Sequence, residues 1–334
     1  MSDTTATTDN APERVSGEAP LWARVLTRAE RKDLERIDPL RAWWTVISNW
    51  VGVFGAMALV AWAPNAFTIV LALFFIGARQ LGMAVVMHEA AHRTLFANRK
   101  LNDWVGNWLA SYPVWTDPGP YRTYHLKHHA HTGVKGDPDL GLIAPFPITR
   151  SSFRRKVFRD LSGKTGLKQA IGVFKRDVGW NTGKLTQRDL SMSRGERPDV
   201  GWHKVAPVAL TNGVLLLILT LAGHPALYLL WVAAWLTTYR LVTRIRSIAE
   251  HSVTPSDSDP LNNTRTTHAN WLERLFLAPN RVNYHLEHHL LVSVPLHNLP
   301  KLHRIMRERG VLDHACLASG YPEVLKLAVS RAEA

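Results

Sequence analysis

Cysteine is almost absent from this chain: Cys316 is the only one among 334 residues. A single cysteine excludes an internal disulfide and any zinc or iron–sulfur site built from several thiolates. The N-terminal segment also lacks the basic region and apolar core of a secretory signal peptide. Its first residues, 1 to about 20, are rich in Thr, Ala and acidic side chains, so we expect them to form a disordered tail.

Acidic residues are scarce relative to basic ones, because 27 Asp and Glu stand against 40 Lys and Arg, a formal net charge of +13. Such a balance would suit a nucleic-acid-binding protein if the charge were spread over a folded domain. Instead, residues 150–204 alone contain 14 Lys or Arg and 5 Asp or Glu, a net charge of +9. A basic segment of this kind is typical of a loop that faces a membrane surface, and we expect no nucleic acid partner.

Four long runs have almost no charged residue: 43–63, 66–86, 205–222 and about 226–242. A helix of roughly 20 apolar residues spans the ~30 Å hydrocarbon core of a bilayer. Only a short turn separates the first run from the second, and the same holds for the third and fourth. The pattern therefore predicts an all-α integral membrane protein with four transmembrane helices in two hairpins.

The distribution of Lys and Arg predicts the orientation of these helices. The two short turns contain neither residue, whereas segments 1–42, 87–204 and 243–334 contain nearly all of them. By the positive-inside rule, both termini and the long polar segment between the hairpins are cytoplasmic. Within that segment, apolar residues recur at helical spacing among cations and predict two interfacial amphipathic helices: Phe153, Val157, Leu161, Leu167, Ile171 and Phe174. Packing of these helices on their own domain is the alternative.

Histidine is concentrated in three short clusters, which hold nine of the 16 histidines: His88 and His92; His125, His128, His129 and His131; His285, His288 and His289. Positions i, i+3 and i+4 lie on one face of a helix, about 5–6 Å apart at Cβ. Each cluster can therefore direct its imidazoles to one point. His131 lies off the face of its neighbours, and we expect it to have a supporting or structural role.

Eight imidazoles are more than a single zinc ion binds, because zinc takes three or four protein ligands. Neutral imidazole suits iron, zinc, copper and nickel, so the clusters indicate a site for two metal ions. All three clusters follow predicted spans on the same side of the membrane. Five acidic residues lie within or beside them and are candidates to accept the second N–H of a ligand imidazole, unless they are solvent-exposed: Glu89, Asp137, Asp139, Glu250 and Glu287.

The clusters read H-E-A-A-H at residues 88–92, H-L-K-H-H at 125–129 and H-L-E-H-H at 285–289. They resemble the three histidine boxes of the membrane fatty acid desaturase family, H-x(3,4)-H, H-x(2,3)-H-H and [HQ]-x(2,3)-H-H. The resemblance extends to the order of spans and boxes from about residue 40 to 305. It implies a membrane domain, 41–305, whose helical cytoplasmic cap holds the metal site, between cytoplasmic tails at 1–40 and 306–334.

The resemblance also implies the chemistry. Two iron ions and O2 would remove two hydrogens from a fatty acyl chain, either lipid-linked or a thioester, while oxygen leaves as water and two electrons are consumed. His251, just after the last span, occupies the place of a ninth iron ligand in the family. Asn283 is a candidate to orient a ligand or a water molecule. The H-P-G-G motif of a fused cytochrome b5 domain is absent, so we expect a separate electron donor of the ferredoxin or cytochrome b5 type.

Three alternatives remain at this stage. Hydroxylases and ketolases of lipids, alkanes or carotenoids have similar boxes. H-E-A-A-H also matches the H-E-x-x-H pattern of zinc proteases, in which the glutamate is the general base, but that interpretation leaves the other two clusters unexplained. A histidine-rich metal transporter would require polar residues along its spans, and these spans contain few.

Overall fold

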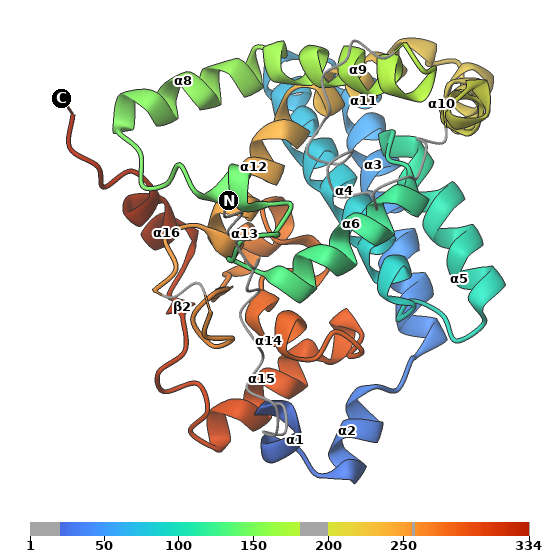
Figure 1. The fold of residues 1–334 in the computed structure, drawn as a ribbon. Coiled ribbons are helices and arrows are strands. Elements are labelled where there is room, and N and C mark those ends of the chain that lie inside the picture. Colours follow the sequence, from blue (N-terminus) through green and yellow to red (C-terminus); the bar gives the residue numbers. More distant parts are fainter. Residues whose placement is uncertain (1–20, 181–199, 256–257, 334) are drawn as a thin grey trace, which may run out of the picture.

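The computed structural model describes residues 21–180, 200–255 and 258–333, so the expected disordered tail at 1 to about 20 lies outside the described residues. The described chain is mostly helical, and its one small sheet pairs two strands in parallel (Figure 1). In chain order its helices and strands are α1 (Leu21–Val25), α2 (Arg28–Leu34), α3 (Pro39–Trp62), α4 (Ala66–His92), α5 (Arg99–Val105), α6 (Pro118–His131), α7 (Leu140–Ile143), α8 (Arg150–Leu161), α9 (Lys164–Asp177), α10 (Trp202–Leu221), α11 (Tyr228–Leu236), α12 (Thr238–His251), β1 (Thr266–Thr267), α13 (Trp271–Phe276), α14 (His285–Leu290), α15 (Leu299–Glu308), β2 (Leu317–Ala318) and α16 (Tyr321–Ala328). Short 3-10 turns and a π-helical segment, Gly106–Ser111, connect some of them.

The prediction of four long apolar helices is confirmed. Within the described residues, four helical stretches are long and apolar enough to cross a membrane: Arg28–Trp62, Ala66–His92, Trp202–Leu221 and Pro225–His251. Their outer surfaces remain apolar and exposed, as Trp62 (83%) and Leu221 (80%) illustrate. Exposed apolar helical surfaces of this extent are compatible with a membrane protein.

N-cap residues determine where the first two of these helices begin. Asp38 begins α3 because its side chain accepts hydrogen bonds from the backbone N–H groups of Leu40 and Arg41, at 2.9 and 3.2 Å. Asn65 begins α4 in the same way. The two helices pack against each other (Figure 1). α4 is six residues longer than the predicted span, 66–86, and ends at His92, so the first histidine box continues the same rigid rod.

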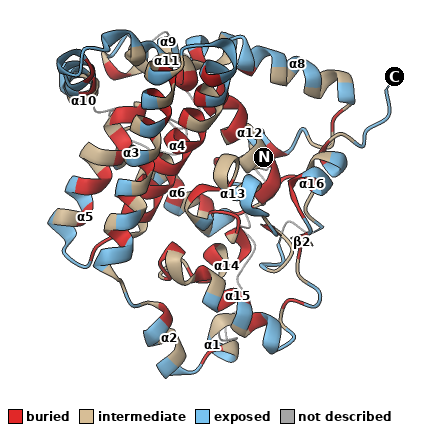
Figure 2. Cartoon of the chain, turned by 180° about the vertical axis from the view of Figure 1, so that it is seen from behind, coloured by how far each residue is buried: buried red, intermediate tan, exposed pale blue. Residues whose placement is uncertain are grey.

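The interior of the molecule lies along α4. Buried residues run down this helix and onto the ends of α12 and α14, whereas α10 is largely exposed (Figure 2). The second half of α4, from Ile76 to Ala91, is almost wholly buried. The first half of α4 is apolar and its second half is buried, so this helix can connect a membrane to a site inside the protein.

The fourth apolar stretch is broken where its apolar run predicts a continuous span at about 226–242. α11 ends and α12 begins around Thr237, whose backbone angles (φ −119°, ψ −86°) are not helical. The break fits the surface of α4, because the hydroxyl of Thr238 donates to the backbone carbonyl of Leu73 at 2.6 Å. Gly77 of α4 faces this point, and its missing side chain allows the two backbones to approach closely.

Two helices, α8 and α9, match the predicted amphipathic segments of the basic loop. A two-point ion pair fixes α8 to α12, since Arg244 donates to Asp160 at 2.6 and 2.9 Å. Four large apolar side chains of these helices are nevertheless exposed: Phe158, Leu161, Leu167 and Ile171. The described part of the basic loop thus presents an apolar face with no protein covering it.

The residues after 305, which were predicted to form a C-terminal tail, are folded into the domain. β2 pairs in parallel with β1, and α16 packs against α12. Their apolar side chains are buried: Leu312, Cys316, Ala318, Tyr321, Val324 and Ala328. Burial of this many side chains makes the segment part of the core, and Cys316 has a packing role within it.

The close approach at Gly77 generates a prediction about stability. A Cβ atom at this position would lie 2.4 Å from Thr238 Oγ1 and 2.8 Å from the backbone nitrogen of Tyr239. We expect Gly77→Ala to lower the free energy of unfolding by about 1–3 kcal/mol, because backbone atoms cannot move aside easily. Gly55→Ala is the control, since a Cβ there meets nothing within 4 Å. Thermal unfolding in detergent measures both, and a Gly77→Ala midpoint at or above that of Gly55→Ala would contradict the packing.

Candidate metal centre

The first histidine pair lies at the C-terminal end of α4. His88 and His92 are one turn apart on the same face, with ring centroids 4.8 Å apart. His88 is 2% exposed. Both of its ring nitrogens are buried without a hydrogen-bond partner. A buried imidazole with two orphaned nitrogens is costly unless something else occupies the space that they face.

The second cluster lies on α6, which Asp117 caps by accepting a hydrogen bond from the backbone N–H of Gly119. His125 and His128 are buried on this helix, and His129 is partly buried. His131 is exposed and its Nδ1 lies 3.0 Å from the backbone carbonyl of Lys127. Its side chain belongs to neither histidine group, as its spacing predicts.

The third cluster forms the short helix α14, and His251 is the last residue of α12. His251 and His285 bring these two helices together, because their Nε2 atoms are 2.8 Å apart. The position that only the family resemblance indicates therefore lies beside the third box. His289 completes the contact, with its Nε2 at 3.1 Å from that of His285.

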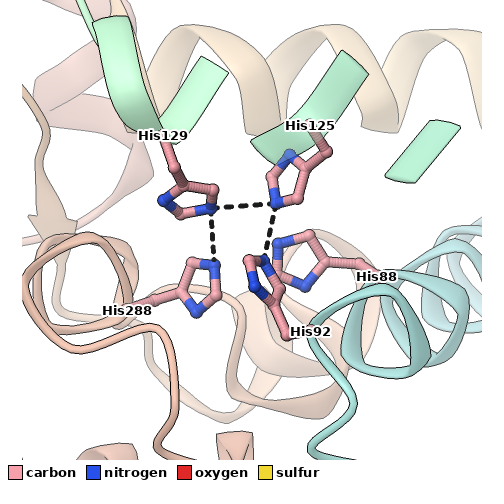
Figure 3. A group of neighbouring side chains, drawn as sticks. All are labelled: His88, His92, His125, His129 and His288. Atoms are coloured by element: carbon pink, nitrogen blue, oxygen red, sulfur yellow. Dashed lines mark hydrogen bonds between the residues drawn. The ribbon is translucent and has the colours of Figure 1, made fainter. Parts of the chain in front are cut away.

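All nine predicted histidines gather into two groups whose ring nitrogens lie within 4.8 Å of one another: His88, His92, His125, His129 and His288 in the first, and His128, His251, His285 and His289 in the second. Figure 3 shows the first group, in which α4, α6 and α14 each contribute side chains that point to a common centre. The groups adjoin each other, since the rings of His129 and His289 are 4.1 Å apart. Four separate parts of the sequence, α4, α6, the end of α12 and α14, thus form one site.

The contacts within the first group cannot all be hydrogen bonds. His125 Nε2 lies 2.9 Å from the Nε2 atoms of both His92 and His129, and His129 Nε2 lies 3.1 Å from that of His288 (Figure 3). A neutral ring nitrogen has either one N–H or one lone pair, so His125 can satisfy only one of its two neighbours.

A cation removes this conflict, because lone pairs from several imidazoles then converge on it. Two nitrogens that bind one ion at about 2.1 Å and at right angles to each other are about 3.0 Å apart. The observed spacings of 2.8–3.1 Å match this value in both groups. The residues present therefore fit two metal ions that are ligated by imidazole.

Hydrogen bonds on the far side of the rings orient some of these histidines. Asp137 lies 2.8 Å from His128 Nδ1 and is itself held by the backbone N–H groups of Gly133 and Asp139. Thr132, at the end of α6, lies 3.1 Å from His289 Nδ1. These partners leave the Nε2 atoms free to face the centre, which is the usual arrangement around a protein-bound metal.

The other predicted acids have different partners. Glu89 accepts hydrogen bonds from the backbone N–H of Leu296 and from Thr94, each at 3.1 Å. Glu287 of the third box bonds to His303 Nδ1 at 2.6 Å. His303 stands alone in the sequence, so no spacing signal could have revealed that it supports α14.

Within the described residues, Asn283 forms no side-chain hydrogen bond to a histidine of either group; its Nδ2 donates to the backbone carbonyl of Thr267 at 3.0 Å. This bond fixes the chain beside β1 immediately before the third box. The structure thus gives Asn283 a role in holding the box in place.

Burial determines the protonation state of the histidines on α6 and α14, which lie outside the four apolar helices. It lowers the pKa of His125, His285, His288 and His289 well below the ordinary value, and neighbouring imidazoles lower the pKa of each further. All four rings are therefore neutral at physiological pH, which is the state that binds metal.

This protonation state predicts how stability depends on pH. In the unfolded chain histidine has a pKa of about 6.5, so below that pH the unfolded state binds more protons than the folded state. We expect the metal-free protein to keep its stability above that pH and to lose it progressively as the pH falls from 6.5 toward 5. Thermal midpoints in detergent at a series of pH values measure this. The dependence should shrink in His285→Gln and persist in His131→Gln, and a midpoint that rises on acidification would contradict it.

Comparison with known proteins agrees with the site. The model of the fatty acid desaturase family matches residues 61–318 of this chain. The dihydrorhizobitoxine desaturase of Bradyrhizobium elkanii is 30% identical over 302 residues, which cover 85% of this chain and 81% of that protein. The sn-1 oleoyl-lipid 12-desaturase of a Picosynechococcus strain is 23% identical, over 83% of this chain and 80% of that protein.

A more limited similarity connects the chain to enzymes with a different named reaction. The beta-carotene 4-ketolase 3 of Haematococcus lacustris is 32% identical over 113 residues, only 31% of this chain and 35% of the ketolase. The family model, in contrast, spans the second, third and fourth apolar helices and all three histidine boxes. The chain therefore belongs to the fatty acid desaturase family.

Proposed function

We propose that this protein desaturates a fatty acyl chain at a di-iron centre, using O2 and electrons from a separate donor protein. The convergence of nine imidazoles into two adjoining groups carries the proposal. Five nitrogens in one group and four in the other exceed the ligand set of any single zinc ion. This count argues against the zinc protease alternative, which would use His88 and His92 with one further ligand.

The membrane arrangement follows from the apolar helices. We propose that α3 and α4 form one transmembrane hairpin and that α10 with α11 and the start of α12 forms the second. The short turns at residues 63–65 and 223–225 contain no Lys or Arg, so the positive-inside rule puts them on the outer side. The histidine groups and both termini are then cytoplasmic, and the exposed apolar residues of α8 and α9 contact the inner leaflet.

When bound, the iron pair supplies the O2 activation that breaks two unactivated C–H bonds, a step beyond the reach of any side chain. The protein contributes position and environment. Its imidazoles are held neutral by burial, Asp137 and Thr132 fix the orientation of two rings, and the surrounding core excludes bulk water. Exclusion of water protects reactive species from side reactions.

The balance of the reaction requires a reductant. Removing two hydrogens from the acyl chain supplies two electrons to O2, and reduction to two water molecules takes four. The other two must come from outside, and we propose an external donor of the ferredoxin or cytochrome b5 type. The basic segment 150–204, with a net charge of +9, would attract an acidic donor protein or anionic lipid head groups.

The extent of similarity favours desaturation over oxygen insertion. The two desaturases cover more than four-fifths of this chain, whereas the ketolase covers less than a third. By name, one desaturase acts on an oleoyl lipid and the other on dihydrorhizobitoxine, so family members differ in substrate. A membrane-embedded acyl chain is the substrate class that the exposed apolar helices make available here.

The ligand assignment predicts the effect of single substitutions. We expect His88→Ala, His128→Ala and His288→Ala each to abolish turnover and to lower the iron content below two per chain while membrane insertion stays intact. Asp137→Ala should weaken metal affinity or activity by about 10–100-fold, because His128 loses its orienting partner. Iron analysis of purified protein measures this, with His131→Ala as the control. Full activity in any of the three ligand variants would contradict the assignment.

The reaction itself is tested by product mass. Expression in a desaturase-deficient host, followed by mass spectrometry of fatty acid methyl esters, should reveal acyl chains that have lost two hydrogen atoms. A product that has gained an oxygen atom would instead establish a hydroxylase. Unchanged acyl profiles together with two irons in the purified protein would contradict the proposed substrate class. They would leave the di-iron assignment standing.

A further inference from the structure

A groove of about 230 Å³ lies between α8 and α16, and none of its lining residues belongs to a histidine group. Figure 1 shows the start of α8 on the same side of the molecule as α16. The backbone N–H of Ile148, just before α8, fixes the two helices there by donating to the carbonyl of Ala328 at 2.8 Å. The groove is lined by Arg150, Phe153 and Arg154 on the α8 side and by Leu325, Lys326 and Val329 on the α16 side.

The groove is one end of a longer stripe on α8. Arg150, Phe153 and Arg154 occupy positions i, i+3 and i+4, so they share one face of the helix. The same face continues at i+8 and i+11 with Phe158 and Leu161, which are 63% and 39% exposed. Cations thus gather at the start of the stripe, and uncovered apolar side chains extend from it.

The charge of the groove is uncompensated at close range. Three cations line it and no acidic residue does. Within the part of the chain that the structure describes, no carboxylate oxygen lies within 4 Å of the side-chain nitrogens of Arg150, Arg154 or Lys326. Like charges that share one concave surface repel each other, and a bound anion would relieve this repulsion.

Two acidic residues stand near these cations, but other groups hold them. The carboxylate of Glu333 accepts hydrogen bonds from the backbone N–H and the hydroxyl of Ser151, both at 2.8 Å. Glu323 accepts from the backbone N–H and the hydroxyl of Ser319, at 2.7 and 2.6 Å. Both carboxylates are therefore directed to serines beside the groove, and neither lines it.

We propose that this groove binds the phosphate head group of an anionic phospholipid, with the first part of its acyl chains against Phe153, Leu325 and Val329. Guanidinium groups match phosphate oxygens through paired hydrogen bonds, and an ammonium group adds a further charge. The apolar wall would have no partner in a free phosphate ion. Phe158 and Leu161 give the acyl chains an apolar surface along which to continue.

Such a lipid would connect two parts of the fold. Both α8 and α16 pack against α12, the helix that ends at His251. A lipid that bridges α8 and α16 would hold them together on the side of α12, and it would stabilise the folded state because it binds only when both helices are in place. The site lies outside the histidine groups, so it does not depend on the di-iron proposal.

The binding test uses the full-length protein, purified in detergent and stripped of lipid. It is titrated with dioleoylphosphatidylglycerol, which is anionic, and with dioleoylphosphatidylcholine, which has the same chains but a choline cation. Native mass spectrometry measures binding, and thermal unfolding measures stabilisation. We expect phosphatidylglycerol to bind at least about tenfold more tightly and to raise the midpoint further. Equal binding of the two lipids would overturn the inference.

A third ligand distinguishes a lipid from a free phosphate. Glycerol 3-phosphate carries the phosphate group but no acyl chain, so the inference expects no binding at the concentrations that saturate with phosphatidylglycerol. Binding of glycerol 3-phosphate as tight as that of the lipid would show that the apolar wall contributes nothing and would refute a lipid site.

Variants locate the site on the molecule. Arg150→Gln, Arg154→Gln and Lys326→Gln should each weaken phosphatidylglycerol binding about fivefold and leave phosphatidylcholine binding unchanged. Arg159→Gln is the matched control, because Arg159 is an exposed cation of the same helix that does not line the groove. A loss in Arg159→Gln as large as that in Arg154→Gln would assign the attraction to the overall charge of the basic segment and contradict a defined site.

Loss of folding is measured separately. The three lining cations are exposed, so the unfolding midpoint of each variant without added lipid should equal that of the wild type. If one variant unfolds early, the other two and the comparison of phosphatidylglycerol with phosphatidylcholine still decide the question. Unchanged phosphatidylglycerol binding in all folded variants would overturn the inference.

Discussion

An imidazole nitrogen that is buried against other imidazole nitrogens requires a cation or a shared proton, and this requirement governs the centre of the molecule. His125 Nε2 and His285 Nε2 each face two further Nε2 atoms at 2.8–3.1 Å. Neither can satisfy both neighbours by hydrogen bonding, because each ring nitrogen has one proton or one lone pair. Added protons would bring repelling charges into a buried site. Metal ions would satisfy every nitrogen at once, so the geometry of the cluster is compatible with metal binding.

The rest of the fold holds these rings in place. α4 is apolar at its exposed first half and buried where it carries His88, so one helix connects the proposed membrane span to the site. The break at Thr237 allows α12 to turn along α4 and present His251. α14 is too short to be stable alone and depends on neighbours such as His303, which bonds to Glu287. Residues after 305 close the domain through β2 and α16.

Much of this could be predicted from the sequence because two signals are strong. Uncharged runs of about 20 residues predict spans, and each predicted span coincides with an observed helical stretch. α4 and α12 nevertheless continue six and about nine residues past the predicted ends, and the fourth stretch is broken at Thr237. Histidines at i, i+3 and i+4 predict a shared face, and all eight box residues meet as expected. His251 follows from family resemblance alone, since a single histidine carries no spacing signal.

What the sequence could not predict depends on contacts between distant segments. The stretch around Thr237 contains no Pro or Gly, and its break arises from the close approach to Gly77. The partners of the acidic residues depend on such contacts too. Asp137 lies beside the Nδ1 of His128, whereas Glu250 lies beside the Nε2 of His285. The C-terminal segment was predicted as a separate tail because the sequence does not reveal that β2 pairs with β1.

The central claim is that each histidine group holds one iron ion. Anomalous diffraction from crystals of the purified protein, recorded on both sides of the iron absorption edge, tests it most directly. The account predicts two iron peaks, one among His88, His92, His125, His129 and His288 and the other among His128, His251, His285 and His289. A single peak, or peaks that appear at the zinc edge and not at the iron edge, would contradict it.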